Sequence, residues 1–254
     1  MGKHHAVSGA AAWVAVTSTV PFTLALRPLP TSSIAIGAVA TAGAALLLDA
    51  DQRSSTFAHS AGALSEGIAV ATGGLTGGHR HGLHSLPAIA GLTFGTVLAG
   101  RWFATVPELG RIPAGSALVF MALVALMMKA LRLGRGGIIT LWLSAAAAVT
   151  VVLAFAHEQM TWLPLAVLVG AATHLLGDAI TTAGIPLLWP WVPKPPHFWS
   201  RTPGLRAVWK SNGYVSVPLL GDAGSAREGV LFGVMSLYIG YVMLATTGII
   251  SVGA

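Results

Sequence analysis

The chain has 254 residues, of which 54% are hydrophobic and 9% are charged, and its mean hydropathy of +0.75 is typical of a membrane protein. It contains no cysteine, which excludes disulfides, iron–sulfur clusters and cysteine-ligated zinc, so any metal site must use His, Asp or Glu. The formal charge of +6 comes from Lys and Arg residues scattered between apolar runs, which is the pattern of topogenic charges and argues against a nucleic-acid partner.

Seven apolar runs are each long enough to approach or cross a hydrocarbon core of roughly 30 Å. They predict an all-α fold, a polytopic integral membrane bundle of about seven transmembrane helices that forms a single domain over residues 1–254. The predicted spans are Ala6–Leu26, Ser33–Leu48, Leu86–Val106, Pro113–Leu131, Gly137–Ala156, Leu163–Thr181 and Gly229–Ile250.

Three of the connections between these spans have sequences that predict a specific structure. Two prolines within Arg27 to Pro30 predict a tight turn that pairs the first two spans. The segment from Gln52 to Gly78 ends in paired glycines and predicts an interfacial amphipathic helix followed by a flexible loop. The stretch from Ile185 to Asp222 is too rich in proline to span, and its tryptophans suit the headgroup level. We expect it to form an ordered, cytoplasmic cap beside the functional site.

The order of the spans gives an independent test of where the polar clusters lie. If the chain crosses at each predicted span, the polar residues near 5, 49–51, 79–84 and 174–178 all fall on one side. Eleven basic residues fall on that same side and three on the other. By the positive-inside rule, the sequence predicts a site that faces the cytoplasm.

Three short clusters hold most of the chemistry-bearing side chains. His174 and Asp178 are four residues apart, so a helix places them on one face, where metal ligation is favoured over a core pair. Asp49 and Asp51 follow the second span; they fit a solvated helix exit, although acids at a helix C-terminus oppose the macrodipole and so favour a bound cation.

The third cluster runs from His79 to Ser85. It follows two glycines and precedes a span that opens with Ser85 and Pro87, so it is expected to deliver imidazoles and Arg80 to a helix N-terminus that could hold phosphate. For His81 alone, a surface position is as good an interpretation as a role in the site.

These motifs, taken in order, resemble the YdjM-type, LexA-regulated membrane-bound metal-dependent hydrolases of the bacterial inner membrane. The resemblance implies distant kinship to zinc-dependent phospholipase C and P1 nuclease, whose sites gather two or three zinc ions. The sequence departs from the family at Gln52, where histidine is frequent, and at His81, where glycine is frequent. By this resemblance the metal ligands are His5, Asp49, Asp51, His79, His84, His174 and Asp178, with Glu228 as a weaker match.

The sequence thus favours an enzyme that hydrolyses a phosphoester in a membrane lipid or lipid-linked substrate with metal-activated water. Asp49 is expected to act as base or bridging ligand, Arg80 to hold phosphate, and Glu228 to take part in catalysis. His and Asp ligands suit zinc first, with manganese or iron as alternatives. Two other classes stay open: a metal-binding membrane transporter, which would need ionisable residues deep in several spans, and a structural or adaptor protein, which would hold no tightly bound metal.

Overall fold

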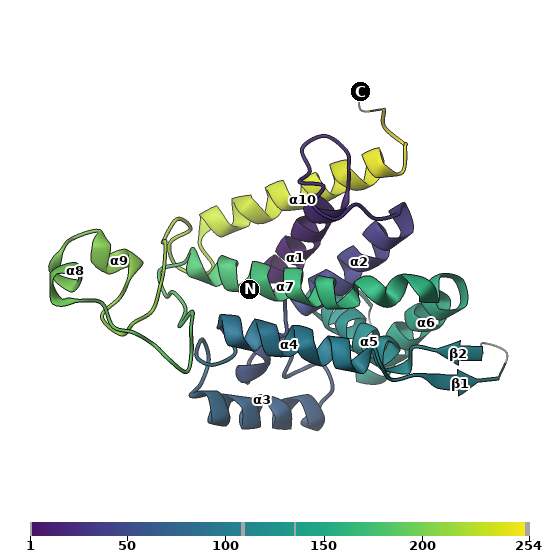
Figure 1. Cartoon of the computed structure of the whole chain (residues 1–254), viewed down its shortest axis with the longest axis horizontal. Helices are drawn as coiled ribbons and strands as arrows, with labels where there is room; N and C mark the ends of the chain where they lie inside the picture. Colours follow the sequence, from purple (N-terminus) through teal and green to yellow (C-terminus); the bar gives the residue numbers. More distant parts are fainter. Residues whose placement is uncertain (1, 108–109, 135, 252–254) are drawn as a thin grey trace.

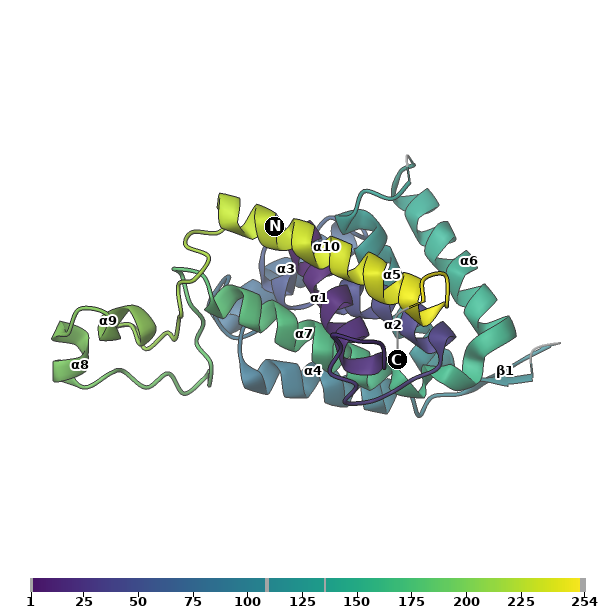
Figure 2. The same ribbon diagram turned by 90° about the horizontal axis from the view of Figure 1, so that it is seen from above.

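The structure is a computed structural model that describes residues 2–107, 110–134 and 136–251. In this part of the chain, ten α-helices, two 3₁₀ turns and one two-stranded hairpin are packed as Figures 1 and 2 show. In chain order they are α1 (Gly2–Thr17), α2 (Thr31–Ala44), η1 (Leu48–Asp51), α3 (Ala63–Thr76), α4 (Leu86–Ala99), β1 (Ala104–Val106), β2 (Gly110–Ile112), α5 (Ala114–Ala130), α6 (Ile138–Ala156), η2 (His157–Trp162), α7 (Leu163–Ala179), α8 (His197–Arg201), α9 (Leu205–Val208) and α10 (Ala226–Thr246).

A helix occurs at each of the seven predicted spans, which confirms the helical membrane bundle in outline. By length and composition, four segments are suited to cross a membrane: Thr31–Asp51, Ile138–Ala156, Met160–Ala179 and Ala226–Thr246. Helices α4 and α5 are apolar but shorter. The total of seven spans therefore stays a prediction.

Two predicted spans are longer than the helices that form. The first was expected to reach Leu26, but α1 ends at Thr17, because Pro21 cannot continue a helix and the chain folds back so that Leu24 donates its N–H to the carbonyl of Ala15. The third was expected to reach Val106, but α4 ends at Ala99. The chain after it forms an antiparallel hairpin of β1 and β2, so the fold is not purely α-helical.

The two long connections, residues 52–78 and residues 185–222, are both partly as expected. A helix, α3, lies in the predicted interfacial segment, with Leu64 and Leu75 exposed by 70% and 82%. In the Trp/Pro-rich segment, only the base lies against the bundle, where Thr181 pairs with Gly221 and Leu187 accepts the N–H of Leu86. Its α8 and α9 lie away from the other helices in both views, so this part does not form the cap that we expected beside the site.

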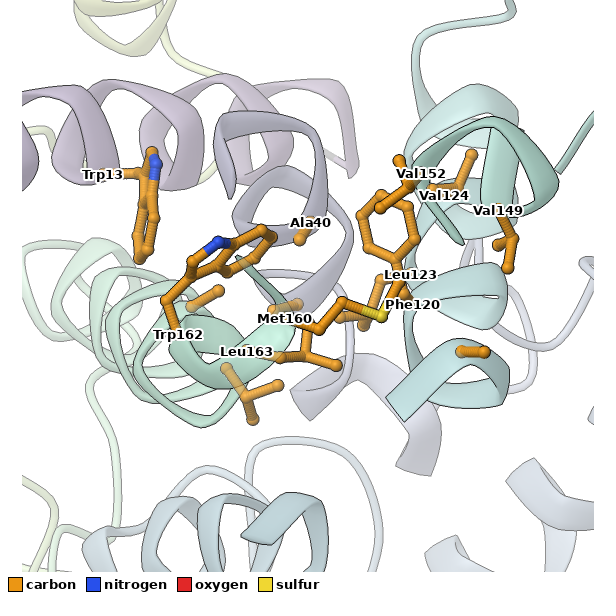
Figure 3. Packing of buried hydrophobic residues seen from close by; sticks show 14 of the residues in the cluster. Trp13, Ala40, Phe120, Leu123, Val124, Val149, Val152, Met160, Trp162 and Leu163 are labelled. Atoms are coloured by element: carbon orange, nitrogen blue, oxygen red, sulfur yellow. The ribbon is translucent and has the colours of Figure 1, made fainter. Parts of the chain in front are cut away.

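The main hydrophobic core is built around aromatic side chains from α1, α5 and the end of η2, just before α7. Trp13 is fully buried, donates its indole N–H to the carbonyl of Ile34 at 3.0 Å and packs with its ring centroid 5.4 Å from that of Trp162. Phe120 packs on the other side of Trp162 (Figure 3). This core anchors α2 between α1, α5 and α7.

Small residues bring these helices into backbone contact. A Cβ added at Gly9 of α1 or at Gly170 of α7 would lie 2.7 Å from the carbonyl oxygen of Thr41 in α2. Membrane helices pack closely where glycines face one another's backbone in this way. Helices α1 and α7 are thereby held against α2, which fixes the position of His5, before Gly9 in α1, and of His174 and Asp178, after Gly170 in α7.

We expect Gly43→Ala to destabilise the protein, because the added Cβ would meet the carbonyl oxygen of Leu123 at 2.0 Å. Overpacking of this kind costs about 1–3 kcal/mol. Gly91→Ala in α4 is the matched control, since a Cβ there has nothing within 4 Å. Thermal unfolding in detergent should show a lower midpoint for the first variant and an unchanged or higher one for the second; equal midpoints would contradict this account of the α2–α5 contact.

Candidate metal centre

The first part of the site is the end of α2. The α-helix stops at Ala44, and the carbonyl of Ala45 is left free of the helical ladder, as the last carbonyls of a helix are. A 3₁₀ turn, η1, then carries Asp49 and Asp51. Because a 3₁₀ helix has three residues per turn, residues two apart point in different directions. Asp49 and Asp51 therefore approach the site from different sides.

The second part is the loop between α3 and α4. Helix α3 ends at Thr76. The next residue, Gly77, adopts the left-handed conformation with φ 88°, and Gly78 donates its N–H to the carbonyl of Gly73, a common glycine-dependent helix end. Arg80 also has a positive φ, 59°, which is uncommon for a residue with a side chain. The loop closes at Ser85, which caps α4, and it leaves His84 completely buried.

The third part is α7, which places His174 and Asp178 on one face as the sequence predicts. Both side chains are buried. His174 Nδ1 lies 2.6 Å from the carbonyl oxygen of Ala45, to which it donates a hydrogen bond. In the neutral imidazole this bond leaves Nε2 with a free lone pair, which is the form that binds a metal. Such a bond also fixes the orientation of the ring.

Four acceptor atoms from these parts converge, and we call them the Nε2 group: His84 Nε2, His174 Nε2, Asp49 Oδ1 and Asp178 Oδ2. The two Nε2 atoms are 3.3 Å apart. Asp178 Oδ2 lies 3.3 Å from His84 Nε2 and 3.6 Å from His174 Nε2, and Asp49 Oδ1 lies 3.8 Å and 3.7 Å from the same two atoms.

The spacing of the Nε2 group fits a small divalent cation. Donor atoms around a tetrahedral Zn²⁺ with bond lengths of about 2.0–2.2 Å lie roughly 3.3–3.6 Å apart. The five distances measured in the Nε2 group span 3.3 to 3.8 Å. Lone pairs and carboxylate oxygens that face each other at this distance repel unless a proton or a cation lies between them. The residues present therefore fit a metal ion with His and Asp ligands.

The other nitrogen of His84 faces Asp51. His84 Nδ1 and Asp51 Oδ2 are 3.2 Å apart, and Asp51 Oδ1 lies 3.1 Å from His79 Nδ1. His84 Nδ1 and Asp51 Oδ2 are buried, and neither makes a hydrogen bond of regular geometry with any described residue. Burial also lowers the pKa of the His84 imidazole, which favours the neutral, metal-binding form. Asp51, His79 and His84 thus make a second group that could hold an ion, or an acidic support for His84.

His5 and Arg80 lie on the outer side of the Nε2 group. The ring of His5 stacks on that of His174 with 3.8 Å between centroids, and its Nε2 is 3.9 Å from Asp178 Oδ1. Arg80 Nη2 donates to the same Asp178 oxygen at 2.7 Å, and Nη1 donates to the hydroxyl of Thr181 at 3.0 Å. A pocket opens beside these side chains, with Leu220, Leu231 and Met235 among its apolar walls.

The site is thus assembled from four segments that are far apart in the sequence. They are the start of α1, the end of α2 with η1, the loop between α3 and α4, and α7. A family model described as YdjM inner membrane protein matches residues 1–249. The chain belongs to that family. Comparison with curated proteins and with solved structures gives no match. The family description is in keeping with a helical membrane protein, and it names no reaction.

All seven residues expected as ligands lie in or beside one cluster. Glu228 does not join it. Ser225 caps α10 by accepting the N–H of Glu228, and the Glu228 carboxylate accepts the N–H of Gly224 and contacts His4 Nδ1. This is the geometry of a helix cap, which the Ser225-x-x-Glu228 spacing could have indicated. Glu228 reaches the neighbourhood of the site only as one of the residues that line the pocket beside His5, Arg80 and Asp178.

The structure corrects one further expectation about the loop and decides between the two interpretations of His81. The start of α4 was expected to offer free N–H groups to phosphate, but Leu86 donates to Leu187, Pro87 has no N–H, and Ala88 donates to the Ser85 hydroxyl. Those donors are already used. The His81 side chain is exposed and packs edge-on against Tyr214, so the surface interpretation of His81 is the correct one.

Contacts of His4, Ala45 and Thr181 were not anticipated. His4 meets Glu228, the Ala45 carbonyl holds His174, and Thr181 holds Arg80. Every residue has a backbone carbonyl, so the sequence cannot indicate that the one at Ala45 binds His174. Thr181 was expected only as the end of the sixth predicted span. Of the three, only His4, next to the predicted ligand His5, carries a side chain whose type points to the site.

Proposed function

We propose that this protein is a membrane-bound metal-dependent hydrolase that cleaves a phosphoester in a lipid or lipid-linked substrate. The observation that carries the proposal is the convergence of His84, His174, Asp49 and Asp178. The two Nε2 atoms lie 3.3 Å apart, and each carboxylate oxygen lies 3.3 to 3.8 Å from both of them, which is close to the spacing of donors around a divalent cation. Zinc is the first choice for this ligand set, and manganese or iron are the alternatives.

The Nε2 group would hold the principal ion, and the group of Asp51, His79 and His84 is the place for a second. A divalent cation bound there would supply a Lewis acid and lower the pKa of bound water. The protein's own contribution is the fixed orientation of the ligands. The Ala45 carbonyl orients His174, and the Asp51 carboxylate lies beside His84 Nδ1. Asp49, whose side chain is 14% exposed at the edge of the group while those of His84 and His174 are fully buried, is the residue best placed to accept a proton.

The pocket beside the Nε2 group supports an anionic, partly apolar substrate. Arg80 and His5 line its polar side, and Leu231 and Met235 of α10 line its apolar side. Only 11% of the apolar window of α10 is buried, so this helix faces outward. A lipid could therefore approach along α10 and present its phosphate to the Arg80 guanidinium, which binds phosphate oxygens through its planar N–H groups.

The position of the site favours an enzyme over a transporter. Asp49 and Asp178 lie within two residues of the ends of the candidate spans Thr31–Asp51 and Met160–Ala179. Transporters bind their substrates near the middle of the membrane, where discontinuous helices meet. A structural or adaptor protein has no need for several buried imidazoles and carboxylates in contact, which would be costly without a cation.

A substrate screen tests the reaction. The metal-loaded protein in detergent micelles should hydrolyse phospholipids or lipid phosphates, and addition of a chelator should abolish turnover. Simple carboxylic esters serve as the comparison, because the same metal-bound water could cleave them without an anion pocket. Hydrolysis of carboxylic esters alone would overturn the phosphoester assignment and leave the metal centre in place.

The orientation in the membrane is a separate prediction. We expect the site to face the cytoplasm and the C-terminus to lie on the other side, because the basic residues gather on the side of the site. Reporter fusions after Lys210 and at the C-terminus should then report opposite compartments. The same compartment for both fusions would mean an even number of crossings between them and would contradict the predicted topology.

A further inference from the structure

A second pocket lies between the end of α5 and the start of α6, away from the Nε2 group. Two basic side chains, Lys129 and Arg132, line it together with the hydroxyl-bearing Thr140 and Ser144. Leu133 and Ile138 supply apolar walls and are 49% and 42% exposed. No carboxylate is among the described residues that line it, and no ion pair of Lys129 or Arg132 occurs in the described part of the chain.

The pocket is at the same end of the bundle as the metal centre. Trp142 of α6 donates its indole N–H to the carbonyl of Ser60 at 2.9 Å, and Ser60 belongs to the segment that follows Asp51. Helix α6 also faces outward, since only 28% of its apolar window is buried and Ile139 is 77% exposed. The basic pocket therefore opens next to an apolar surface suited to acyl chains.

We propose that this pocket binds the phosphate-bearing headgroup of an anionic phospholipid, such as phosphatidylglycerol, whose acyl chains lie against α6. Lys129 and Arg132 supply the charge, and Thr140 and Ser144 supply hydroxyl donors to phosphate oxygens. Basic pockets between membrane helices bind anionic lipid headgroups in this way. The apolar walls beside the cations favour a lipid over a free phosphate ion. This inference goes beyond the proposed function and does not depend on it.

Native mass spectrometry of the full-length protein in detergent tests the site. Titration with phosphatidylglycerol and, separately, phosphatidylcholine should show clear preference for the anionic lipid. The variant Lys129→Gln/Arg132→Asn should weaken phosphatidylglycerol binding about tenfold or more, because each cation near a phosphate contributes substantially to affinity. Asn is chosen at position 132 because it tolerates the left-handed conformation there, where φ is 55°.

The matched control removes two exposed cations from the same predicted side, Arg201 of α8 and Arg206 of α9, as Arg201→Gln/Arg206→Gln. This variant should bind phosphatidylglycerol within about twofold of the wild type, since bulk charge alone is a weak, screened effect. Equal lipid preference in wild type and Lys129→Gln/Arg132→Asn, or equal losses in both double variants, would overturn the proposal. Displacement of the lipid by millimolar inorganic phosphate would also overturn it, because the site would then bind a soluble anion.

Discussion

His174→Ala is expected to lower the affinity for a divalent cation at least about 100-fold, more than the loss of an outer-shell partner does. His174 contributes one of the two nitrogen ligands of the Nε2 group. Without it, a cation held by Asp49 and Asp178 keeps only one nitrogen ligand from this group. Because metal binding is linked to folding, the variant should also unfold at a lower temperature. Asp178→Ala should behave in the same way. Metal content by elemental analysis and thermal unfolding by circular dichroism give the two readouts.

His81→Ala is the matched control for these ligand variants. It removes an imidazole from the same loop as His84, but the His81 side chain is exposed and directed to Tyr214. Its metal content should equal that of the wild type. Equal metal content in His81→Ala, His174→Ala and Asp178→Ala would reduce the His174 and Asp178 pair to a structural feature of α7.

Arg80→Gln is expected to keep the metal and to lose phosphoester turnover by about 10²–10³-fold, the size of effect seen when a donor to transition-state charge is removed. Arg80 lines the pocket and holds Asp178 Oδ1, not the Oδ2 atom of the Nε2 group. The loss should therefore fall mainly on kcat, and metal content should stay at the wild-type level. Single-turnover kinetics with a lipid phosphate and elemental analysis measure the two quantities.

The control for Arg80→Gln is Arg101→Gln, which removes the same charge from a pocket near the β1–β2 hairpin, away from the Nε2 group. It should turn over phosphoesters at the wild-type rate. If Arg80→Gln is fully active, the guanidinium plays no part in holding phosphate. If Arg80→Gln loses its metal instead, the residue acts by fixing Asp178.

The sequence was informative where a short-range rule applies. The spacing of His174 and Asp178 is one helical turn, so their shared face follows from the geometry of α7. Alternate crossings at the seven predicted spans, whose number stays a prediction, place residues 5, 49–51, 79–84 and 174–178 on one side without any knowledge of side-chain packing, and the structure brings these residues together. The helices themselves followed from apolar runs bounded by glycine and proline.

The sequence was less informative where tertiary contacts decide. Arg80 pairs with Asp178, which is 98 residues away, and the residues around neither of them predict this pairing. The apolar run through Val106 is equally compatible with a helix or a strand, and pairing with Gly110 to Ile112 selects the strand. Glu228 was matched by its position in a motif, while its contacts are those of a helix cap.

The metal content of the wild-type protein, purified in a mild detergent without a metal-affinity step, decides whether the Nε2 group holds an ion. We expect at least one equivalent of tightly bound divalent metal, most readily zinc, which survives gel filtration and leaves on treatment with a strong chelator. Metal content at the level of the buffer, in protein that is folded and reloaded with zinc, manganese or iron, would contradict this expectation.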